Sequence, residues 1–490
     1  MLAAAALSAV ALAGAWPAPV RAQSGPGSVE SFVDTEFPGS GAPGLAYALV
    51  ADGEVTSVGA RGVVERGRDE AVTPDTPFVT GSISKSFTAL SVMQLVEAGK
   101  VDLDARLSRY LDVFADRPAG AITVRQLLSH TSGYSTVQGN ASHADVTPGQ
   151  DELARRVDHL ADVAPANPPD EQWEYSNTNY EILGRLVEVV SGREYQAYVA
   201  EAILEPVGMA NSFVADGEIH EAMATGHTPW FGTKRPLPGN RTSRGSAPQG
   251  GVVASANDLA RYLRMMMNGQ DDVLSAGGKS LMMRPASAMS PFYGLGWRVD
   301  PGTGAVWHDG VSPGVETLAS MLPTEKTAAV VLVNGGSGFG FGETGHLRSG
   351  IAARALGLDD DNGSAWSRQA FFLSLVVMPI TYLLSMAWAW RRRSQIRAKV
   401  TGGFSGLFSL WFPLLTTLVA AWVLVGLVPS LFGTPLGTLR LFAPDLVVVL
   451  VASAVTGVLW AAFRLWVAYA DRIRRPSRQA APIGDDRTVP

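Results

Sequence analysis

The chain has 490 residues, with 39 Lys and Arg, 45 Asp and Glu and a formal net charge of -6. This balance gives no overall basic field, which argues against nucleic acid as a partner. The chain contains 0 Cys, which excludes disulfides, thiol nucleophiles and Cys-ligated zinc. Only 17% of the residues are charged and 47% are hydrophobic, and this composition indicates membrane segments.

The N-terminal residues 1–22 are typical of a secretory signal peptide. An apolar, Ala-rich run over residues 2–16 precedes Val20 and Ala22, the two small residues that a signal peptidase reads. No Lys or Arg precedes the apolar run, so a buried helix is the alternative interpretation. We predict that the residues after this segment are exported.

Residues 28–357 are predicted to form one globular unit. The stretch GLAYALVADGEVTSVGARGV alternates around Asp52-Gly53, as two strands joined by a tight hairpin would. Helices and loops are expected up to about residue 210, before strand-like, β-branched runs and a final helix over residues 343–356. Strands at both ends with helices between them predict an α+β fold, in which distant parts of the chain complete one sheet.

Three long apolar runs follow a polar linker at residues 358–369. Each run reaches the roughly 20 residues that cross a bilayer as a helix. The runs cover residues 370–390, 404–427 and 446–470. They contain almost no interior acid or base, so membrane anchoring is a simpler role for them than transport.

The basic residues around these runs predict their orientation. The loop RRRSQIRAK after the first run is strongly basic, as is the tail at residues 471–490. By the positive-inside rule, both are cytoplasmic. The chain is therefore predicted to be a multi-pass cell membrane protein whose residues 28–357 lie on the extracytoplasmic side, with the lipid bilayer as a partner.

The segment TGSISKSF at residues 80–87 places Lys85 three residues after Ser82. A helix over Ser82 to Gly99 is predicted by its apolar spacing, and in it the i, i+3 pair shares one face. A lysine can take the proton of a serine only if its ammonium is desolvated or opposed by another cation. The alternative is that Ser82 caps the helix and Lys85 extends to water.

Two later motifs carry groups that can work with this pair. The tripeptide YSN runs from Tyr175 to Asn177, just before an amphipathic helix. A tyrosine can relay a proton, and an asparagine amide has the donor and the acceptor that hold a substrate amide. The tripeptide HDG runs from His308 to Gly310, where a glycine would let a substrate lie against the edge of a strand.

Ser-x-x-Lys, Tyr-x-Asn and a basic residue-x-Gly, in this order, resemble the serine β-lactamase and penicillin-binding-protein superfamily. The chain is similar to the branch with class C β-lactamases, D-alanyl-D-alanine carboxypeptidases, D-aminopeptidases and β-lactamase-like esterases. The resemblance extends to the phrases LLSHTSGY, QGGVVASANDLARYL and YGLGW. It implies a β-lactamase/transpeptidase-like antiparallel sheet, flanked by helices, with a helical insert.

The resemblance implies a serine hydrolase that forms an acyl-enzyme. Ser82 would attack a carbonyl carbon and become acylated, and Lys85 and Tyr175 would share the proton transfers. Which of the two is the acylation base stays open, because strongly coupled groups need not titrate separately. Water would then release the acyl group, without a cofactor or a metal ion.

The resemblance also assigns the substrate-binding groups. Asn177 would hold the substrate amide, and His308 and Gly310 would stand on the strand edge across the cleft. The backbone N–H groups of Ser82 and Val311 would form the oxyanion hole. The substrate would be a small molecule or a peptide of the cell envelope that carries an ester, amide or peptide bond.

The third motif departs from the Lys-Thr-Gly of many relatives. His308 replaces the lysine, so its charge is expected to change near neutral pH. Asp309 replaces a hydroxyl residue that helps to receive a substrate carboxylate. If Asp309 points into the cleft, it repels that carboxylate; if strand alternation turns it away, this argument lapses. This departure from Lys-Thr-Gly favours esters, amides and amine-bearing peptides as substrates.

Two other interpretations remain. The pentapeptide GVSPG around Ser312 matches the nucleophile elbow of α/β-hydrolases, although Pro313 lacks the N–H that this elbow needs. The chain can also be an envelope receptor or scaffold that binds penicillin-like ligands without turnover. The histidines outside the HDG motif are scattered, which gives little support for a metal site, and His130 is expected to be a hydrogen-bonded structural residue.

Overall fold

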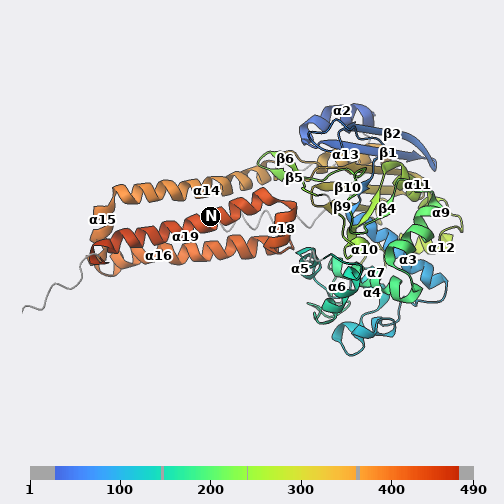
Figure 1. Ribbon diagram of the computed structural model, residues 1–490, viewed down its shortest axis with the longest axis horizontal. Helices are drawn as coiled ribbons and strands as arrows, with labels where there is room; N and C mark the ends of the chain where they lie inside the picture. Colours follow the sequence, from blue (N-terminus) through green and yellow to red (C-terminus); the bar gives the residue numbers. More distant parts are fainter. Residues whose placement is uncertain (1–27, 145–147, 240, 360–364, 474–490) are drawn as a thin grey trace, which may run out of the picture. The chain divides into compact units, whose positions relative to one another are not determined.

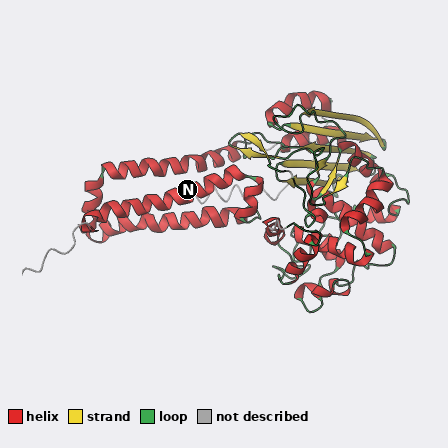
Figure 2. Ribbon diagram, viewed as in Figure 1, coloured by secondary structure: helices red, strands yellow, loops and turns green. Residues whose placement is uncertain are grey.

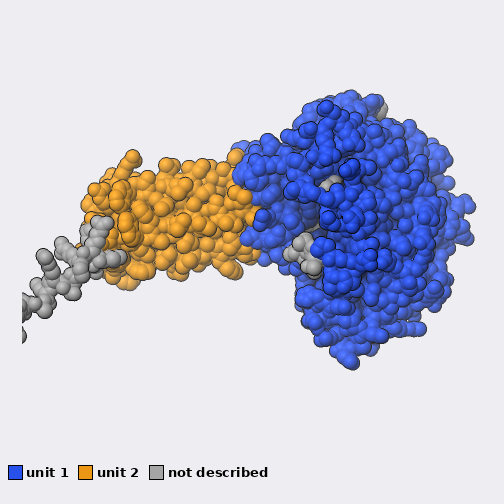
Figure 3. All heavy atoms as spheres, in the orientation of Figure 1, with its two compact units in different colours: residues 1–370, 429–446 blue, residues 371–428, 447–490 orange. Residues whose placement is uncertain are grey.

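The computed structural model describes residues 28–144, 148–239, 241–359 and 365–473. The predicted signal peptide and most of the predicted cytoplasmic tail lie outside these residues. The chain divides into two compact units (Figure 3). The first contains the residues up to Ala370 together with Pro429–Leu446, and the second contains Phe371–Val428 and the residues from Val447.

A six-stranded antiparallel sheet forms the centre of the first unit, in the order β2-β1-β11-β10-β9-β8 (Figures 1 and 2). Its strands are β1 (Gly44–Ala51), β2 (Glu54–Gly62), β8 (Arg298–Val299), β9 (Val306–Ser312), β10 (Val315–Leu322) and β11 (Thr327–Val333). The first strand of the chain pairs with the last one, β11. The predicted α+β fold, with one sheet completed by distant parts of the chain, is confirmed.

The turn between β1 and β2 lies where the sequence predicts it. Ala51 pairs with Glu54, and the two residues between them, Asp52 and Gly53, have φ of 53° and 76°. Positive φ at both central positions is the geometry of a two-residue hairpin turn, for which Asp-Gly is a preferred sequence.

Helices cover both faces of the sheet. On one face, α2 (Val29–Ser40) and α13 (Gly345–Leu356) pack over a cluster that includes Leu45 and Val331. On the other face, Ala46 and Val330 belong to the main core, where α11 (Ala256–Met267) packs on β1 and β11. The central strands are therefore buried on both sides, which explains why they are apolar almost throughout.

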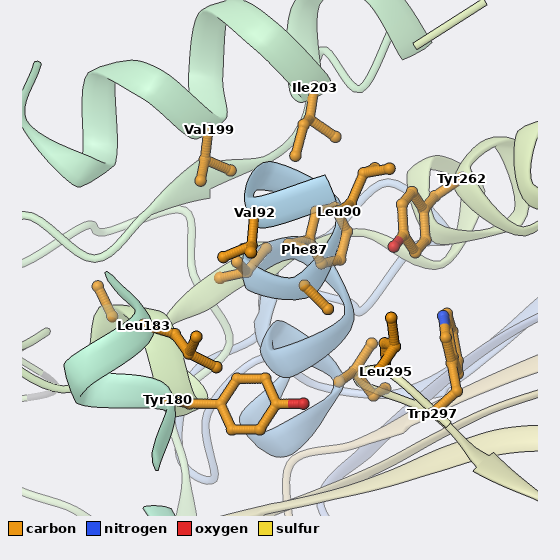
Figure 4. Close-up of a cluster of buried hydrophobic side chains, with 14 of the residues drawn as sticks. Phe87, Leu90, Val92, Tyr180, Leu183, Val199, Ile203, Tyr262, Leu295 and Trp297 are labelled. Atoms are coloured by element: carbon orange, nitrogen blue, oxygen red, sulfur yellow. The ribbon is translucent and has the colours of Figure 1, made fainter. Parts of the chain in front are cut away.

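Helix α3 (Ser84–Glu97) is the buried centre of the helical region. All its residues from Ser84 to Met93 are buried, and the polar ones among them, such as Ser84, Lys85 and Thr88, form hydrogen bonds inside the unit. Gly99, with φ of 70°, follows its end, so the predicted helix stop is confirmed. Figure 4 shows Phe87, Leu90 and Val92 of α3 enclosed by Tyr180, Leu183, Val199, Ile203, Tyr262, Leu295 and Trp297.

The helical insert and two small sheets complete this part of the unit. The helices are α4 (Val124–Leu128), α5 (Thr136–Ala141), α6 (Glu152–Ala161), α7 (Asn177–Ser191), α8 (Tyr195–Val199), α9 (Glu205–Val207), α10 (Ala247–Gly250) and α12 (Ala276–Met282). The small sheets are β3 (Phe78–Val79), β7 (Val252–Ala254) and β4 (Phe213–Val214), and β5 (His227–Trp230) with β6 (Thr233–Pro236).

Three helical stretches near the C-terminus are long and apolar enough to cross a membrane: Trp366–Arg391, Gly403–Leu431 and Pro444–Ala470. They contain α14 (Trp366–Arg391), α16 (Gly403–Trp422), α17 (Val428–Leu431) and α19 (Pro444–Ile473), and α15 (Arg393–Ala398) and α18 (Leu436–Phe442) lie between them. Each predicted apolar run is thus confirmed as helical. The first helix begins at Trp366, inside the segment predicted as linker, because the polar turn before residue 370 continues the helix.

Candidate active site

Ser82 lies in the 3₁₀ turn Gly81–Ile83 that leads into α3. Hydroxyl residues on either side fix this turn to strand β7. Thr80 donates from its N and Oγ1 to the carbonyl oxygen of Val252, at 2.9 and 2.8 Å, and Ser84 Oγ accepts from Val252 N at 2.9 Å. Thr80 and Ser84 therefore hold the helix start in place, and Ser82 is left free of this structural role.

Lys85 is completely buried beside Ser82. Its Nζ donates to Ser82 Oγ at 3.1 Å, to Asn177 Oδ1 at 2.8 Å and to the carbonyl oxygen of Gln249 at 2.7 Å. Burial lowers the pKa of Lys85 well below its ordinary value, against the opposing attraction of the Glu181 carboxylate. The structure thus supplies the desolvation that lets a lysine act as a base.

Tyr175 completes the group around the serine hydroxyl. Its ring centroid lies 4.9 Å from Lys85 Nζ, and its hydroxyl interacts with the side chain of Ser82. Burial raises the pKa of Tyr175 well above its ordinary value, although the Ser82 interaction lowers it. The phenol is therefore a neutral donor and acceptor next to the serine and the lysine.

His130 holds the segment that carries Tyr175. Its Nδ1 accepts from Ser176 N at 3.1 Å and lies 3.1 Å from Asn179 Nδ2, and its ring centroid is 4.4 Å from that of Tyr175. Burial lowers the pKa of His130 well below its ordinary value, so the ring stays neutral and can accept these bonds. The predicted structural role of His130 is confirmed.

His308 is a neutral, buried residue of β9. Its Nδ1 lies 2.7 Å from the carbonyl oxygen of Asp309, which can only accept, so Nδ1 carries the proton. Its Nε2 then accepts from the hydroxyl of Tyr293 at 3.1 Å. Burial lowers the pKa of His308 to about 3. The expectation that its charge changes near neutral pH is therefore wrong, because burial removes the water that would stabilise the charged ring.

Asp309 forms an ion pair with Arg298, a residue that the sequence analysis did not consider. Arg298 Nε lies 3.3 Å from Asp309 Oδ1, and its guanidinium carbon is 5.7 Å from the ring centroid of Tyr175. Although burial opposes it, the Arg298 guanidinium lowers the pKa of Asp309 below its ordinary value. Repulsion of a substrate carboxylate by a free Asp309 is therefore not expected. In the sequence, Arg298 could have been noticed because it directly follows the YGLGW phrase.

Two glycines bring the helix start and strand β9 together. A Cβ on Gly310 would lie 2.0 Å from the carbonyl oxygen of Thr80, and one on Gly81 would lie 2.7 Å from Val311 N. Because Gly310 has no side chain, the start of the helix can approach β9 closely. From the sequence, we expected this glycine to make room for substrate instead. The approach places the amide of Val311 next to the turn that carries Ser82.

The edge of β9 beside these residues is only partly covered. Strand β8 pairs with Trp307 and Val306 at the beginning of β9, and the pairing ends there. Ser312 lies at the other end, where it pairs with Val315 across the hairpin to β10. An α/β-hydrolase elbow requires a strand-to-helix turn in a mainly parallel sheet, so that interpretation of Ser312 is wrong.

Asn177 connects the lysine to a part of the site that the sequence analysis missed. Its Nδ2 donates to Asn140 Oδ1 at 2.9 Å and lies 3.2 Å from His143 Nε2. Burial lowers the pKa of His143 to about 4, so its Nε2 is free to accept. Neither residue stands at a motif spacing from Asn177, and only the folded chain brings them together.

Comparisons with known proteins agree with this fold. The Beta-lactamase family model matches residues 29–352. Penicillin-binding protein 4 of Amycolatopsis lactamdurans is 36% identical over 320 residues, which cover 60% of this chain and 81% of that protein. Putative penicillin-binding protein PbpX of Bacillus subtilis is 28% identical over 296 residues, covering 58% of this chain and 69% of that protein.

Solved structures show the same fold. The octameric penicillin-binding protein homologue from Pyrococcus abyssi has a TM-score of 0.56 at 26% identity, over 63% of this chain and 73% of its own. A D-amino acid amidase from Ochrobactrum anthropi SV3 has a TM-score of 0.55 at 24% identity, over 66% of this chain and 94% of its own. Since the family model matches well over half of the chain, the protein belongs to the beta-lactamase family of serine hydrolases.

Proposed function

We propose that this protein is a membrane-anchored, extracytoplasmic serine hydrolase that forms an acyl-enzyme on Ser82. The observation that carries the proposal is the 3.1 Å contact between Lys85 Nζ and Ser82 Oγ. The lysine has no exposed surface, and its lowered pKa makes the neutral amine available. A neutral amine in contact with a serine hydroxyl is the activated pair that nucleophilic catalysis requires.

Acylation begins when Lys85 takes the proton of Ser82 and the Oγ atom attacks the substrate carbonyl carbon. The backbone N–H groups of Ser82 and Val311 donate to the oxygen that becomes negative. As the bond to the leaving group breaks, Tyr175 gives its proton to the leaving oxygen or nitrogen and regains one from Lys85. The raised pKa of Tyr175 and the lowered pKa of Lys85 favour the lysine as base and the tyrosine as relay.

Deacylation reverses the order of these proton transfers. A water molecule gives one proton to the Lys85 and Tyr175 pair and attacks the acyl carbon. The bond to Ser82 Oγ breaks, and Oγ regains its proton from the same pair. Free acid and the starting enzyme result, so the site needs no co-reactant besides water.

The substrate class follows from the groups around the nucleophile. Asn177 Oδ1 accepts from Lys85 and has a second lone pair that can accept from a substrate N–H, and β9 offers a strand edge for an extended substrate. His308 is neutral and Arg298 is paired with Asp309, so the third motif carries no free cation of the Lys-Thr-Gly kind. These features support esters, amides and peptide bonds of uncharged acyl groups as substrates.

Covalent labelling tests this proposal. The full chain in detergent is treated with a fluorophosphonate and with a fluorescent penicillin, and hydrolysis of short-chain esters, D-aminoacyl amides and D-Ala-D-Ala peptides is measured. Wild type is expected to be labelled and active, whereas Ser82→Ala is expected to show neither property. Ser86→Ala is the matched control, because Ser86 Oγ donates to the carbonyl oxygen of Ile83 and accepts from the hydroxyl of Tyr262, and neither bond involves Ser82 or Lys85. The absence of an adduct with every probe would indicate a binding protein instead.

A further inference from the structure

The segment that joins the second and third candidate membrane helices belongs to the same compact unit as the predicted catalytic residues. This interhelical segment, Pro429–Leu446, contains helix α18 (Leu436–Phe442) (Figure 1). It follows the catalytic motifs by more than 100 residues. We therefore infer the role of this segment from its contacts with other residues of the unit.

The interhelical segment holds Asn140 at two points. Asn140 Nδ2 donates to the carbonyl oxygen of Gly433 at 2.8 Å, and Thr438 Oγ1 donates to the carbonyl oxygen of Asn140 at 2.9 Å. Gly433 has φ of 66°, a left-handed conformation that a residue with a side chain rarely adopts. Nearby, the rings of Phe442 and His143 pack edge to face with centroids 5.8 Å apart.

Asn140 in turn contacts the amide that faces the lysine. Its Oδ1 accepts from Asn177 Nδ2 at 2.9 Å, and Asn177 Oδ1 accepts from Lys85 Nζ at 2.8 Å. Lys85 Nζ is the group in contact with Ser82 Oγ. A continuous series of hydrogen bonds thus runs from the carbonyl of Gly433 to the predicted nucleophile.

The carbonyl of Gly433 determines the donor-to-acceptor direction of this series of hydrogen bonds. A backbone carbonyl only accepts, so Asn140 must turn its NH₂ group toward Gly433 and its Oδ1 toward Asn177. Asn177 must then turn its NH₂ group toward Asn140 and its Oδ1 toward Lys85. If the Asn177 amide were reversed, its N–H would compete for the lone pair of a neutral lysine. The observed direction leaves that lone pair to the proton of Ser82.

We propose that the interhelical segment is a positioning element of the catalytic site, in which Thr438 and the carbonyl of Gly433 fix Asn140 so that Asn177 presents its oxygen to Lys85. The inference rests on the proposed function of Ser82 and Lys85. Asn140 and Thr438 are positioning residues, since neither contacts the reacting atoms. The catalytic unit is accordingly complete only when the chain includes the connection between two of its membrane helices.

Variants of the full chain in detergent test this role, with the rate of fluorophosphonate acylation as the readout. Thr438→Val keeps the shape of the side chain but removes its donor, and it is expected to slow acylation about tenfold. Thr438→Ser restores the hydroxyl and is expected to restore the rate. Asn140→Leu removes both amide contacts and is expected to slow acylation about 100-fold, because the Asn177 amide loses its fixed direction.

A matched pair of glycine variants separates positioning from general damage. A Cβ on Gly433 would meet Thr136 Cγ2 at 2.9 Å and strain the left-handed backbone, whereas a Cβ on Gly437 meets nothing within 4 Å. Gly433→Ala is therefore expected to slow acylation while the probe concentration that gives half-maximal labelling stays unchanged, and Gly437→Ala is expected to leave both quantities unchanged.

The outcomes distinguish this inference from the proposed function. No labelling of wild type at Ser82 overturns both. Normal labelling of wild type together with unchanged rates in Thr438→Val and Gly433→Ala overturns the positioning role alone. A Thr438→Ser variant as slow as Thr438→Val also overturns it, because the loss would then not depend on the hydroxyl.

Discussion

Lys85 Nζ lies 3.1 Å from Ser82 Oγ, and both residues come from the first turns of one buried helical segment. The remaining contacts of Nζ go to Asn177 Oδ1 and to the carbonyl oxygen of Gln249. A charged ammonium uses all three of its donors in this arrangement. When the lysine loses its proton, the Ser82 hydroxyl is the partner that can donate to the lone pair.

The Glu181 carboxylate is expected to set the acid side of the pH profile. Burial raises the pKa of Glu181 to about 7, and its charged form raises the pKa of Lys85. Glu181→Gln removes that attraction and lowers the pKa of Lys85. Because the base must be neutral, the acid limb of kcat/KM against pH should move to lower pH.

Glu152→Gln is the control for this shift. Glu152 and Glu181 both pair with Arg156, at 2.8 and 3.4 Å, but the influence on Lys85 comes from Glu181. The Glu152 variant should therefore keep the acid limb of wild type. An acid limb that stays in place or moves to higher pH in Glu181→Gln would contradict the assignment of Lys85 as base.

The ion pair between Asp309 and Arg298 is expected to restrict substrates that carry a carboxylate. Asp309→Thr releases the guanidinium and supplies a hydroxyl, so acylation by penicillin should rise about tenfold relative to acylation by a neutral ester. Stopped-flow rates with both acyl donors measure this ratio. Adding Arg298→Met to the first change should abolish the gain, and a gain that survives in the double variant would show that Arg298 is not responsible.

Buried histidines are expected to make the protein less stable in mild acid. Burial lowers the pKa of His143 to about 4 and that of His308 to about 3, against about 6.5 in an unfolded chain. Above pH 6.5 neither the folded nor the unfolded state protonates these histidines, so the histidines do not make the free energy of unfolding depend on pH. Below it the unfolded state binds protons first, and the free energy of unfolding should fall by about 1.4 kcal/mol per pH unit for each histidine.

Urea unfolding between pH 7.5 and 5 measures this dependence. His143→Asn removes one of the buried histidines and should reduce the slope by about 1.4 kcal/mol per pH unit. His159→Asn, at an exposed position of α6, is the control and should keep the slope of wild type. Equal slopes in wild type and His143→Asn would show that His143 is charged in the folded protein.

The absence of cysteine allows a direct test of the predicted orientation. Ser57→Cys on β2 and Ser394→Cys on α15 each add one thiol at an exposed position of a chain with 0 Cys. An impermeant maleimide applied to intact cells should label Ser57→Cys and should label Ser394→Cys only after lysis. The reverse pattern would place residues 28–357 on the cytoplasmic side.

The parts of the fold and site that depend on neighbours in sequence could be predicted. The hairpin at Asp52-Gly53 and the i, i+3 relationship of Ser82 and Lys85 are of this kind, because turn geometry and helix periodicity determine them. The order of the three motifs identified the family.

The remaining features depend on contacts that only the folded chain creates. Arg298 reaches Asp309 by pairing of β8 with β9, and Asn140 reaches Asn177 through the packing of the helical insert. The pKa of His308 depends on what covers β9, which a strand pattern does not reveal. For the same reason, no spacing in the sequence indicated that the interhelical segment contacts Asn140.

The most direct test of the account is the site and rate of fluorophosphonate adduct formation on the full chain, followed by mass spectrometry. The account predicts one adduct on Ser82, formed about 10²- to 10⁴-fold more slowly in Lys85→Met, because general base catalysis is lost. Lys100→Met changes an exposed lysine and should react as wild type does. An adduct on another serine, or equal rates in wild type and Lys85→Met, would contradict the account.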